Sequence, residues 1–387
     1  MDGDVIYLDY NASTPCDPRV VEAMLPHLTE TYANPSSRSH RPGRDAFTAL
    51  EDARAKVARR LGARSPTEIY FTSGATEANN LALRGVARAR ADRGRHLVTQ
   101  VTEHPSVLEP LRSLRQDGWE LTEVGVNENG RLRVDDLAAA LRDDTILVSL
   151  MHANNETGTL QPVRQAAALV HQRGALLHCD AAQSVGKVGV DVSDLGVDLL
   201  TLSGHKLYAP KGIGALYVRR TKPALNVHPL LLGGGHESGL RSGTPNLPGA
   251  AGLACAVEIA VDALEAEGHQ IAEHRDRLEA SVVGNLENCT INGEPDHRLP
   301  GTTNLSFAGV EGNALLASLP DLAVSSGSAC TSSHSEASPV LLAMGVSPSL
   351  ARASLRLSVG RFTTSDDVDR AAQRIVEEVQ RLRSLRR

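Results

Sequence analysis

Aromatic residues are scarce in this sequence, which limits the ligands that it can bind by stacking. Phe, Trp and Tyr make up 3% of the 387 residues, and there is one Trp. Proteins that hold single-stranded nucleic acid use aromatic side chains as stacking platforms. The net charge of −6 also disfavours binding to a phosphate backbone. We therefore expect no direct contact with nucleic acid.

Cysteine is also scarce, and its spacing excludes two common kinds of structural site. The chain has five cysteines, none of them in a Cys-x-x-Cys pair: Cys16, Cys179, Cys255, Cys289 and Cys330. We therefore expect neither a disulfide framework nor a structural zinc site, and no metal ligand set. Cysteines without such pairing are typical of a reducing compartment, so we expect a cytoplasmic protein.

Long apolar segments and targeting signals are absent as well. No apolar run approaches the length of a membrane span. The N-terminal stretch MDGDVIYLDY is acidic and has no signal or transit pattern. We expect no association with a membrane.

Apolar runs typical of strands alternate with amphipathic segments over residues 68–220. This alternation predicts an α/β fold, with a mainly parallel seven-stranded sheet flanked by helices. The predicted strands are 68–73, 96–101, 120–126, 145–151, 175–181, 199–203 and 214–220, and the predicted helices between them are 75–91, 105–116, 135–142 and 162–173.

The pattern changes after the glycine-rich segment 233–249, where strands and helices no longer alternate strictly. One long helix is predicted over 249–284, followed by strands at 289–294, 302–309, 322–327 and 354–360 and a last helix at 364–385. This order predicts a smaller α+β domain. We expect a large domain at 15–255, and a small domain made of 1–14 and 256–387.

A lysine stands between two apolar runs, in the turn Ser203-Gly204-His205-Lys206. Lysine normally lies on a solvated face. Held near a buried site, Lys206 would lose its charge more readily and become a nucleophile toward carbonyls, such as the aldehyde of pyridoxal phosphate. The alternative is a lysine in a surface loop that happens to follow a strand.

A phosphate site is predicted where the strand at 68–73 ends. Gly74 turns the chain there, and a helix begins at Ala75 and Thr76, whose free amides and dipole favour an anion. Ser203 and His205 would add donors if the two turns lie side by side. The alternative is an ordinary turn between a strand and a helix.

Four polar residues follow other predicted strands, at the edge where open α/β sheets bind ligands. Asp180 would pair with a protonated pyridine nitrogen, and Gln183 would bond the ring oxygen. His104 would lie on the ring or shuttle protons, and Asn155 would place an amide at the same edge. The alternatives are a helix cap, a structural histidine and turn formation.

Two further residues point to the substrate. Arg356 lies in the predicted strand 354–360, where a guanidinium can bind a carboxylate through two parallel hydrogen bonds or form a structural ion pair. Cys330 lies in SSGSACTSSHSEAS, a small polar segment typical of an exposed loop. Its thiol would act as a nucleophile once ionised. The alternative is an incidental loop cysteine.

Together these residues resemble the cysteine desulfurases of the NifS/IscS type, which are class V aminotransferases with the fold-type-I pyridoxal phosphate architecture. The resemblance covers almost the whole chain. Its most specific motifs are NPSSRSH, TSGATEANN, TEH, HANNETG, DAAQSVGK, SGHKLYAPKGIGALYVRR, GGGHESGLRSGT and SSGSACTSS.

The resemblance implies a role for each matched position. Lys206 would bind the cofactor aldehyde, His104 would stack on the ring and transfer protons, and Cys330 would be the nucleophile. Asp180 would pair with the ring nitrogen. The remaining cofactor contacts would come from Ala75, Thr76, Asn155, Gln183, Ser203, His205 and, from the other subunit of a homodimer, Thr244. Substrate contacts would come from Arg356 and Asn155.

The activity that the resemblance implies is removal of sulfur from L-cysteine, giving L-alanine and a persulfide on Cys330. A protein of an Fe–S scaffold, tRNA-thiolation or DNA-phosphorothioation system would then accept the sulfur, and Cys330 could transiently ligate an Fe–S cluster. The chain ends at Arg387, without the C-terminal extension that helps many members dock a scaffold. The alternatives are a selenocysteine lyase, another class V aminotransferase, or a non-catalytic relative that acts as a binding partner.

Overall fold

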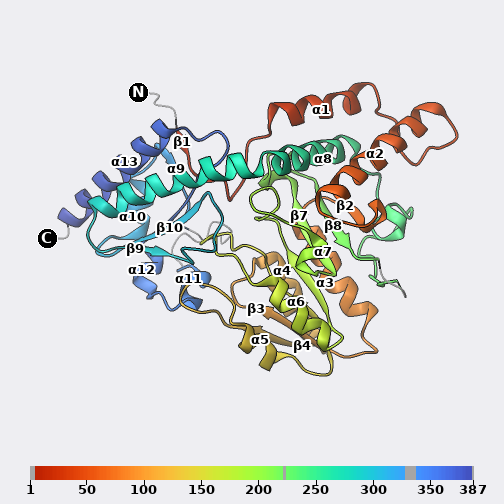
Figure 1. The fold of residues 1–387 in the computed structure, drawn as a ribbon, viewed down its shortest axis with the longest axis horizontal. Coiled ribbons are helices and arrows are strands. Elements are labelled where there is room, and N and C mark those ends of the chain that lie inside the picture. The colour runs from red at the N-terminus through yellow and green to blue at the C-terminus, as the bar shows by residue number, and fades with distance from the viewer. Residues whose placement is uncertain (1–4, 221–223, 327–336, 386–387) are drawn as a thin grey trace.

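A seven-stranded sheet forms the centre of the larger part of this computed structural model, which describes residues 5–220, 224–326 and 337–385 (Figure 1). The strand order is β2-β8-β7-β6-β5-β3-β4, and only β8 runs antiparallel to its neighbours. The mainly parallel sheet predicted from the sequence is thereby confirmed. The strands are β2 (Ile69–Thr72), β3 (His96–Gln100), β4 (Glu120–Val124), β5 (Thr145–Ser149), β6 (Leu176–Asp180), β7 (Leu199–Ser203) and β8 (Gly214–Val218).

Helices cover both faces of this sheet, which is why its inner strands are continuous apolar runs. On one face, α3 (Ala75–Ala89) and α4 (Pro105–Gln116) pack on alternate residues such as Leu97 and Leu176. On the other face, Val98 and Leu177 contact the opposite core. The helices of that side are α2 (Arg41–Arg60), α5 (Val134–Ala140), α6 (Val163–Gln172), α7 (Val192–Leu195) and α8 (Leu247–Asp262), with α1 (Pro18–Thr29) against α8.

The strand order reverses next to β3. Its successor β4 lies on one side of it, and β5 lies on the other. At such a reversal the connecting segments leave in opposite directions, and a crevice opens at the carboxyl ends of the strands. The segments that follow β3, β5, β6 and β7 all start at that edge.

The C-terminal part of the chain builds a second, antiparallel sheet in the order β12-β10-β9, and β1 (Ile6–Tyr7) pairs with β11 (Leu322–Ala323) beside it. Its apolar core includes Leu8, Leu305 and Leu357. The other elements are α9 (Leu264–Asn285), β9 (Cys289–Asn292), β10 (Thr302–Phe307), α10 (Gly312–Ala317), α11 (Pro339–Ala343), α12 (Pro348–Arg352), β12 (Ser354–Ser358) and α13 (Ser365–Ser384). The domain boundaries given above stay predictions.

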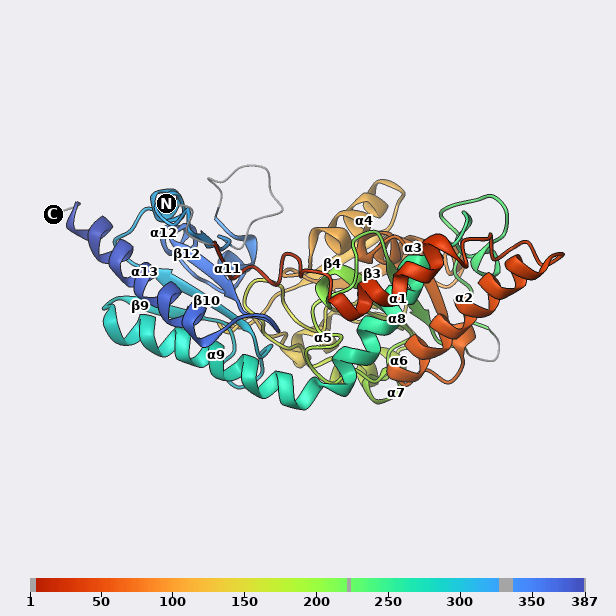
Figure 2. The same cartoon turned by 90° about the horizontal axis from the view of Figure 1, so that it is seen from above.

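The single long helix predicted over 249–284 is wrong, because the chain bends by 75° between α8 and α9. Ala263 ends one helix and begins the next. α8 packs in the core of the larger sheet, whereas α9 lies along the smaller sheet and α13 (Figure 2). No Gly or Pro marks the bend, so helical periodicity alone did not reveal it.

No single helix in the described ranges is both long and apolar enough to cross a membrane. α8 and α9 meet that criterion only as a bent pair.

The carboxylate of Asp17 joins the start of α1 to the C-terminal part of the chain. It accepts hydrogen bonds from Arg19 (Nη2–Oδ2 2.8 Å) and Arg361 (Nη1–Oδ2 2.6 Å), and its side chain is 2% exposed. Arg361 also donates to Glu267 of α9. The hydrogen bonds from Arg19 hold the pKa of Asp17 well below its ordinary value, against the effect of burial, and Arg361 adds to them.

We expect Asp17→Asn to lower the free energy of unfolding by about 3 kcal/mol at neutral pH, because the buried guanidinium of Arg361 loses one of its two anionic partners. The folded pKa lies below that of the unfolded chain. The contribution of Asp17 is therefore complete above about pH 4 and is lost as the pH falls below it. The difference between the two proteins should shrink by about 1.4 kcal/mol per pH unit below that point. Urea unfolding followed by circular dichroism measures it.

Asp194→Asn is the matched control, since the Asp194 side chain is 76% exposed and pairs with Arg164 at the surface. Its effect should stay below about 0.5 kcal/mol at every pH. An equal loss for Asp17→Asn at neutral and acidic pH would contradict this account of Asp17.

Candidate active site

Lys206 lies at the edge of the larger sheet, in a short 3-10 turn (Gly204–Lys206) directly after β7. Its Nζ donates to the backbone oxygens of Asn11 (2.5 Å) and Ala12 (3.0 Å). These carbonyls belong to the N-terminal segment that crosses from the smaller sheet. The lysine is half-buried, as a nucleophile at the edge of a crevice requires.

Asn11 connects Lys206 to other predicted site residues. Its backbone oxygen also accepts from Gln183 Nε2 (2.8 Å), and its Nδ2 donates to the backbone oxygen of Asn155 (3.2 Å). Its Oδ1 accepts from Lys187 Nζ (3.2 Å). Asn11 thus brings Lys206, Gln183 and Asn155 to one place.

A second lysine, Lys187, orients the amide of Gln183. Lys187 Nζ donates to Gln183 Oε1 (2.9 Å). Because an ammonium only donates, the amide nitrogen of Gln183 must face the other way, toward Asn11. Burial lowers the pKa of Lys187 to about 7, and the cations of Lys206 and Arg356 contribute.

Asp180 ends β6 with both carboxylate oxygens bonded. Oδ1 accepts from the backbone N–H of Ala182 (2.9 Å), and Oδ2 accepts from Asn79 Nδ2 (2.8 Å) in α3. The side chain is therefore fixed in one orientation at the sheet edge, as a partner for a ring nitrogen must be.

A second carboxyl lies buried near Asp180. Glu103 Oε1 accepts from the backbone N–H of Met151 (2.5 Å), while its Oε2 has no hydrogen-bond partner among the described residues. Burial, and then the charge of Asp180, raise the pKa of Glu103 well above its ordinary value. Both effects favour the protonated form of Glu103.

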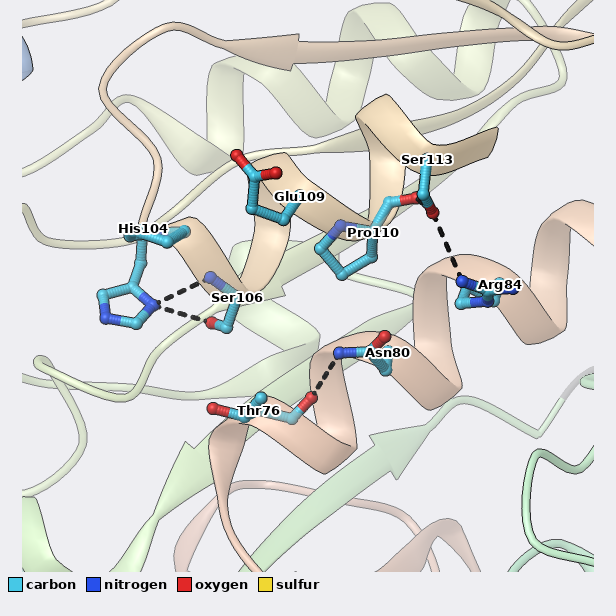
Figure 3. A pocket seen from close by; sticks show the side chains of 9 residues that line it. Thr76, Asn80, Arg84, His104, Ser106, Glu109, Pro110 and Ser113 are labelled. Carbon is cyan, nitrogen blue, oxygen red and sulfur yellow. Dashed lines mark hydrogen bonds between the residues drawn. The ribbon is translucent and has the colours of Figure 1, made fainter. Parts of the chain in front are cut away.

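His104 caps the N-terminus of α4 and lines a pocket of about 480 Å³ between α3 and α4 (Figure 3). Its Nδ1 lies 2.8 Å from Ser106 Oγ and 3.1 Å from the Ser106 backbone nitrogen. Burial lowers the pKa of His104, the charge of Asp180 opposes this, and the cation of Lys206 lowers it further. The same pocket is lined by Thr76.

The two turns proposed to hold phosphate lie side by side. Gly214, which begins β8, pairs with Thr72 on one side and with Ser203 on the other. At Gly74 the backbone has φ of 153°, a conformation that favours glycine, and a Cβ there would meet nothing within 4 Å. α3 begins at this turn without a side-chain cap for its first amides.

His205 lies in the second of these turns. Its Nδ1 is 3.2 Å from Ser13 Oγ. Burial lowers the pKa of His205 to about 4, and nearby lysines, first Lys206, act in the same direction. The imidazole is therefore neutral and offers at most one N–H to an anion.

Arg356 lies in β12, buried at 3% exposure, and reaches the same group of residues. Nη2 donates to Asp9 Oδ1 (2.6 Å) and Nη1 to the backbone oxygen of Asn155 (3.1 Å). Within the described part of the chain its Nε has no partner. The structural ion pair and an unsatisfied donor thus coexist, and the donor suits a substrate carboxylate.

Two predicted residues are not brought to this cluster by the described contacts. Thr244 is exposed, three residues after Arg241, which donates to Glu77 in the first turn of α3 (2.8 Å). Cys330 lies outside the described residues. In the ranges that the structure does describe, no group of three His, Cys, Asp or Glu is placed to hold a metal.

The sequence reasoning missed several residues of this site: Asn11, Asn79, Glu103, Ser106 and Lys187. Glu103 could have been found from the sequence, because it is a carboxylate that lies two residues after the predicted strand 96–101. For the others the signal was weak, because Asn79 lies inside a helix and Asn11 in a turn, where the residue type is common for other reasons.

Comparisons with known proteins show the family of this chain. The model of the family described as aminotransferase class-V matches residues 6–371. A protein of Anaeromyxobacter sp. (strain Fw109-5) named "Cysteine desulfurase IscS" is 50% identical over 380 residues, 98% of this chain and 94% of that protein. A solved structure named "NIFS-LIKE PROTEIN" superimposes with a TM-score of 0.91 at 36% identity, covering 98% of this chain and 100% of that one. "SspA in complex with cysteine" gives a TM-score of 0.81 at 36% identity over 92% of this chain and 99% of its own.

Proposed function

The chain belongs to the class V aminotransferase family and is a cysteine desulfurase, and we propose which of its residues carry out the reaction. The substrate is L-cysteine, and the products are L-alanine and a persulfide on Cys330. The bond between the substrate's Cβ and its sulfur breaks, and a bond between that sulfur and the Cys330 sulfur forms. L-cysteine and one thiol thus give L-alanine and one persulfide, without a further reductant.

The residues at the sheet edge fit pyridoxal phosphate. Asp180 would hold the ring nitrogen, Gln183 and Asn155 the ring oxygen, and Lys206 the aldehyde. The phosphate would lie against the open turn of α3, held by Ala75, Thr76, Ser203 and His205. One observation supports the fit. The uncapped N-terminus of α3 at Gly74 lies beside Ser203, at the same sheet edge as the half-buried Lys206. Bound there, the cofactor supplies an electron sink for the substrate's Cα.

Lys206 is the proposed base that removes the proton from Cα. Its Nζ donates to two backbone carbonyls, which hold the amine in one position. His104 is proposed to stack on the ring.

Arg356 is proposed to bind the carboxylate of L-cysteine, together with Asn155. Asp9 and the Asn155 backbone fix its guanidinium, so little side-chain entropy is lost when substrate binds.

Thr244 is proposed to reach the phosphate of the other subunit in a homodimer. Its exposure leaves it available for such a contact. We propose a sulfur acceptor from an Fe–S scaffold, tRNA-thiolation or DNA-phosphorothioation system, and a cytoplasmic setting that keeps Cys330 reduced.

Incubating the purified protein with L-cysteine tests the proposal. Alanine and sulfide should form in equal amounts when a reductant is present, because each turnover leaves one persulfide to be reduced. Formation of a keto acid instead of alanine would indicate an aminotransferase, and turnover of L-selenocysteine without L-cysteine would indicate a selenocysteine lyase. Absence of all products would indicate a non-catalytic relative.

A further inference from the structure

We propose that Asn79 and Ser106 are positioning residues that hold His104 as a neutral imidazole with its proton on Nε2. The inference deepens the proposed function, and it rests on that function for the place of His104 beside the ring. The hydrogen bonds themselves belong to the chain and can be measured without turnover.

The orientation of the Asn79 amide follows from Asp180. Asn79 is fully buried in α3, and its Nδ2 lies 2.8 Å from Asp180 Oδ2 and 2.9 Å from Ser106 Oγ. A carboxylate only accepts hydrogen bonds, so the group that faces Asp180 must be the amide nitrogen. Its second N–H then points at Ser106.

The hydroxyl of Ser106 has one hydrogen to give. Because Ser106 Oγ accepts from Asn79, its own hydrogen is available for the other neighbour, His104 Nδ1 at 2.8 Å. The backbone N–H of Ser106 also donates to the same nitrogen, at 3.1 Å. Figure 3 shows both contacts converging on one ring nitrogen. His104 Nδ1 therefore accepts two hydrogen bonds, and the proton of the neutral ring lies on Nε2.

Protonation of Nδ1 is disfavoured from three sides. A hydrogen on Nδ1 would point at the hydroxyl and the backbone N–H of Ser106, which both donate to that nitrogen. It would also break the cap of α4. The positive end of that 12-residue helix repels a cation at its first turn. Burial and the cation of Lys206 act in the same direction, and the charge of Asp180 opposes them.

This arrangement decides between the two roles of His104. A ring whose Nδ1 is occupied by two donors cannot take up a proton there without breaking both bonds. His104 then serves by stacking and by donating its Nε2–H, and proton transfer at Cα is left to Lys206. A neutral histidine at a helix N-terminus is a known device for such donation.

Nitrogen NMR of the holoenzyme with isotope-labelled histidine tests the tautomer. His104 is one of 14 histidines, and the signal missing in His104→Gln assigns it. We expect an unprotonated, hydrogen-bonded Nδ1 and a protonated Nε2 that persist through the pH range where free imidazole titrates. A proton on Nδ1 at neutral pH would overturn the proposal.

Three variants separate positioning from mere stability. Ser106→Ala removes one donor, so the other tautomer should become visible and kcat should fall about 2- to 10-fold with little change in KM. Ser106→Thr keeps the hydroxyl, and its extra methyl can enter the adjoining pocket, so it should restore both readouts. Ser113→Ala, in the same helix and pocket but bonded to Arg84 and Pro110, is the matched control and should change neither.

Asn79→Leu tests the other member of the pair. It keeps the volume of the side chain but removes both donors, so the tautomer should shift as in Ser106→Ala. An unchanged His104 spectrum in Ser106→Ala or Asn79→Leu would overturn the role of that residue. An intact tautomer in a protein that forms no alanine would instead reject the proposed function and leave this inference standing.

Discussion

Replacing Lys206 by alanine should abolish the visible absorbance of the bound cofactor and lower kcat by about a thousandfold or more. The physical reason is that one side chain is proposed to hold the cofactor aldehyde and to move the Cα proton, and loss of a positioned base alone costs about 10²- to 10⁴-fold. In the structure Lys206 Nζ donates to the backbone carbonyls of Asn11 and Ala12, whereas the neighbouring amine of Lys187 is bonded to the side chains of Asn11 and Gln183. Absorbance spectroscopy and alanine formation measure the two effects.

Lys56→Ala is the matched control for this change. Lys56 lies on α2, about half exposed, and pairs with Glu258 at 3.0 Å. Its loss should leave absorbance and alanine formation within about twofold of the starting protein. If Lys206→Ala kept its absorbance band, Lys206 would not be the residue that binds the cofactor.

Replacing Cys330 by serine should reduce alanine formation by about a hundredfold or more while the cofactor absorbance remains. A hydroxyl is far less acidic than a thiol and is a poor nucleophile toward sulfur, so the transfer step fails although the substrate still binds. This expectation rests on the sequence and the family, since Cys330 lies outside the described residues. Alanine analysis and labelling of persulfide sulfur provide the measurement.

Cys289→Ser is the control for a general effect of cysteine loss. Cys289 lies in β9, and burial raises the pKa of its thiol to about 11. A thiol that stays protonated cannot act as the nucleophile. Normal alanine formation in Cys330→Ser, with persulfide found on another cysteine, would disprove the assignment of Cys330.

The α/β architecture can be predicted from the sequence, because apolar runs typical of strands alternate with amphipathic segments typical of helices. The sequence also located Lys206, Asp180 and His104, because each lies at the end of an apolar strand or a few residues beyond it, and the carboxyl ends of parallel strands meet at one edge. These features are local in the chain. A periodic pattern or a strand end can be recognised within about ten residues.

The tertiary structure alone decided how these residues are held. Asn11 is hydrogen-bonded to Ser358, 347 residues away in the sequence, and to Gln183, 172 residues away. The amide of Asn79 is oriented by Asp180, which is 101 residues away. Such contacts leave no pattern in the nearby sequence, because the hydrogen-bond partner of a buried polar group can come from any part of the chain. The bend at Ala263 belongs to the same class, as it is set by the two separate cores that α8 and α9 cover. The tautomer inferred for His104 likewise depends on residues of α3, α4 and β6 that only folding brings together.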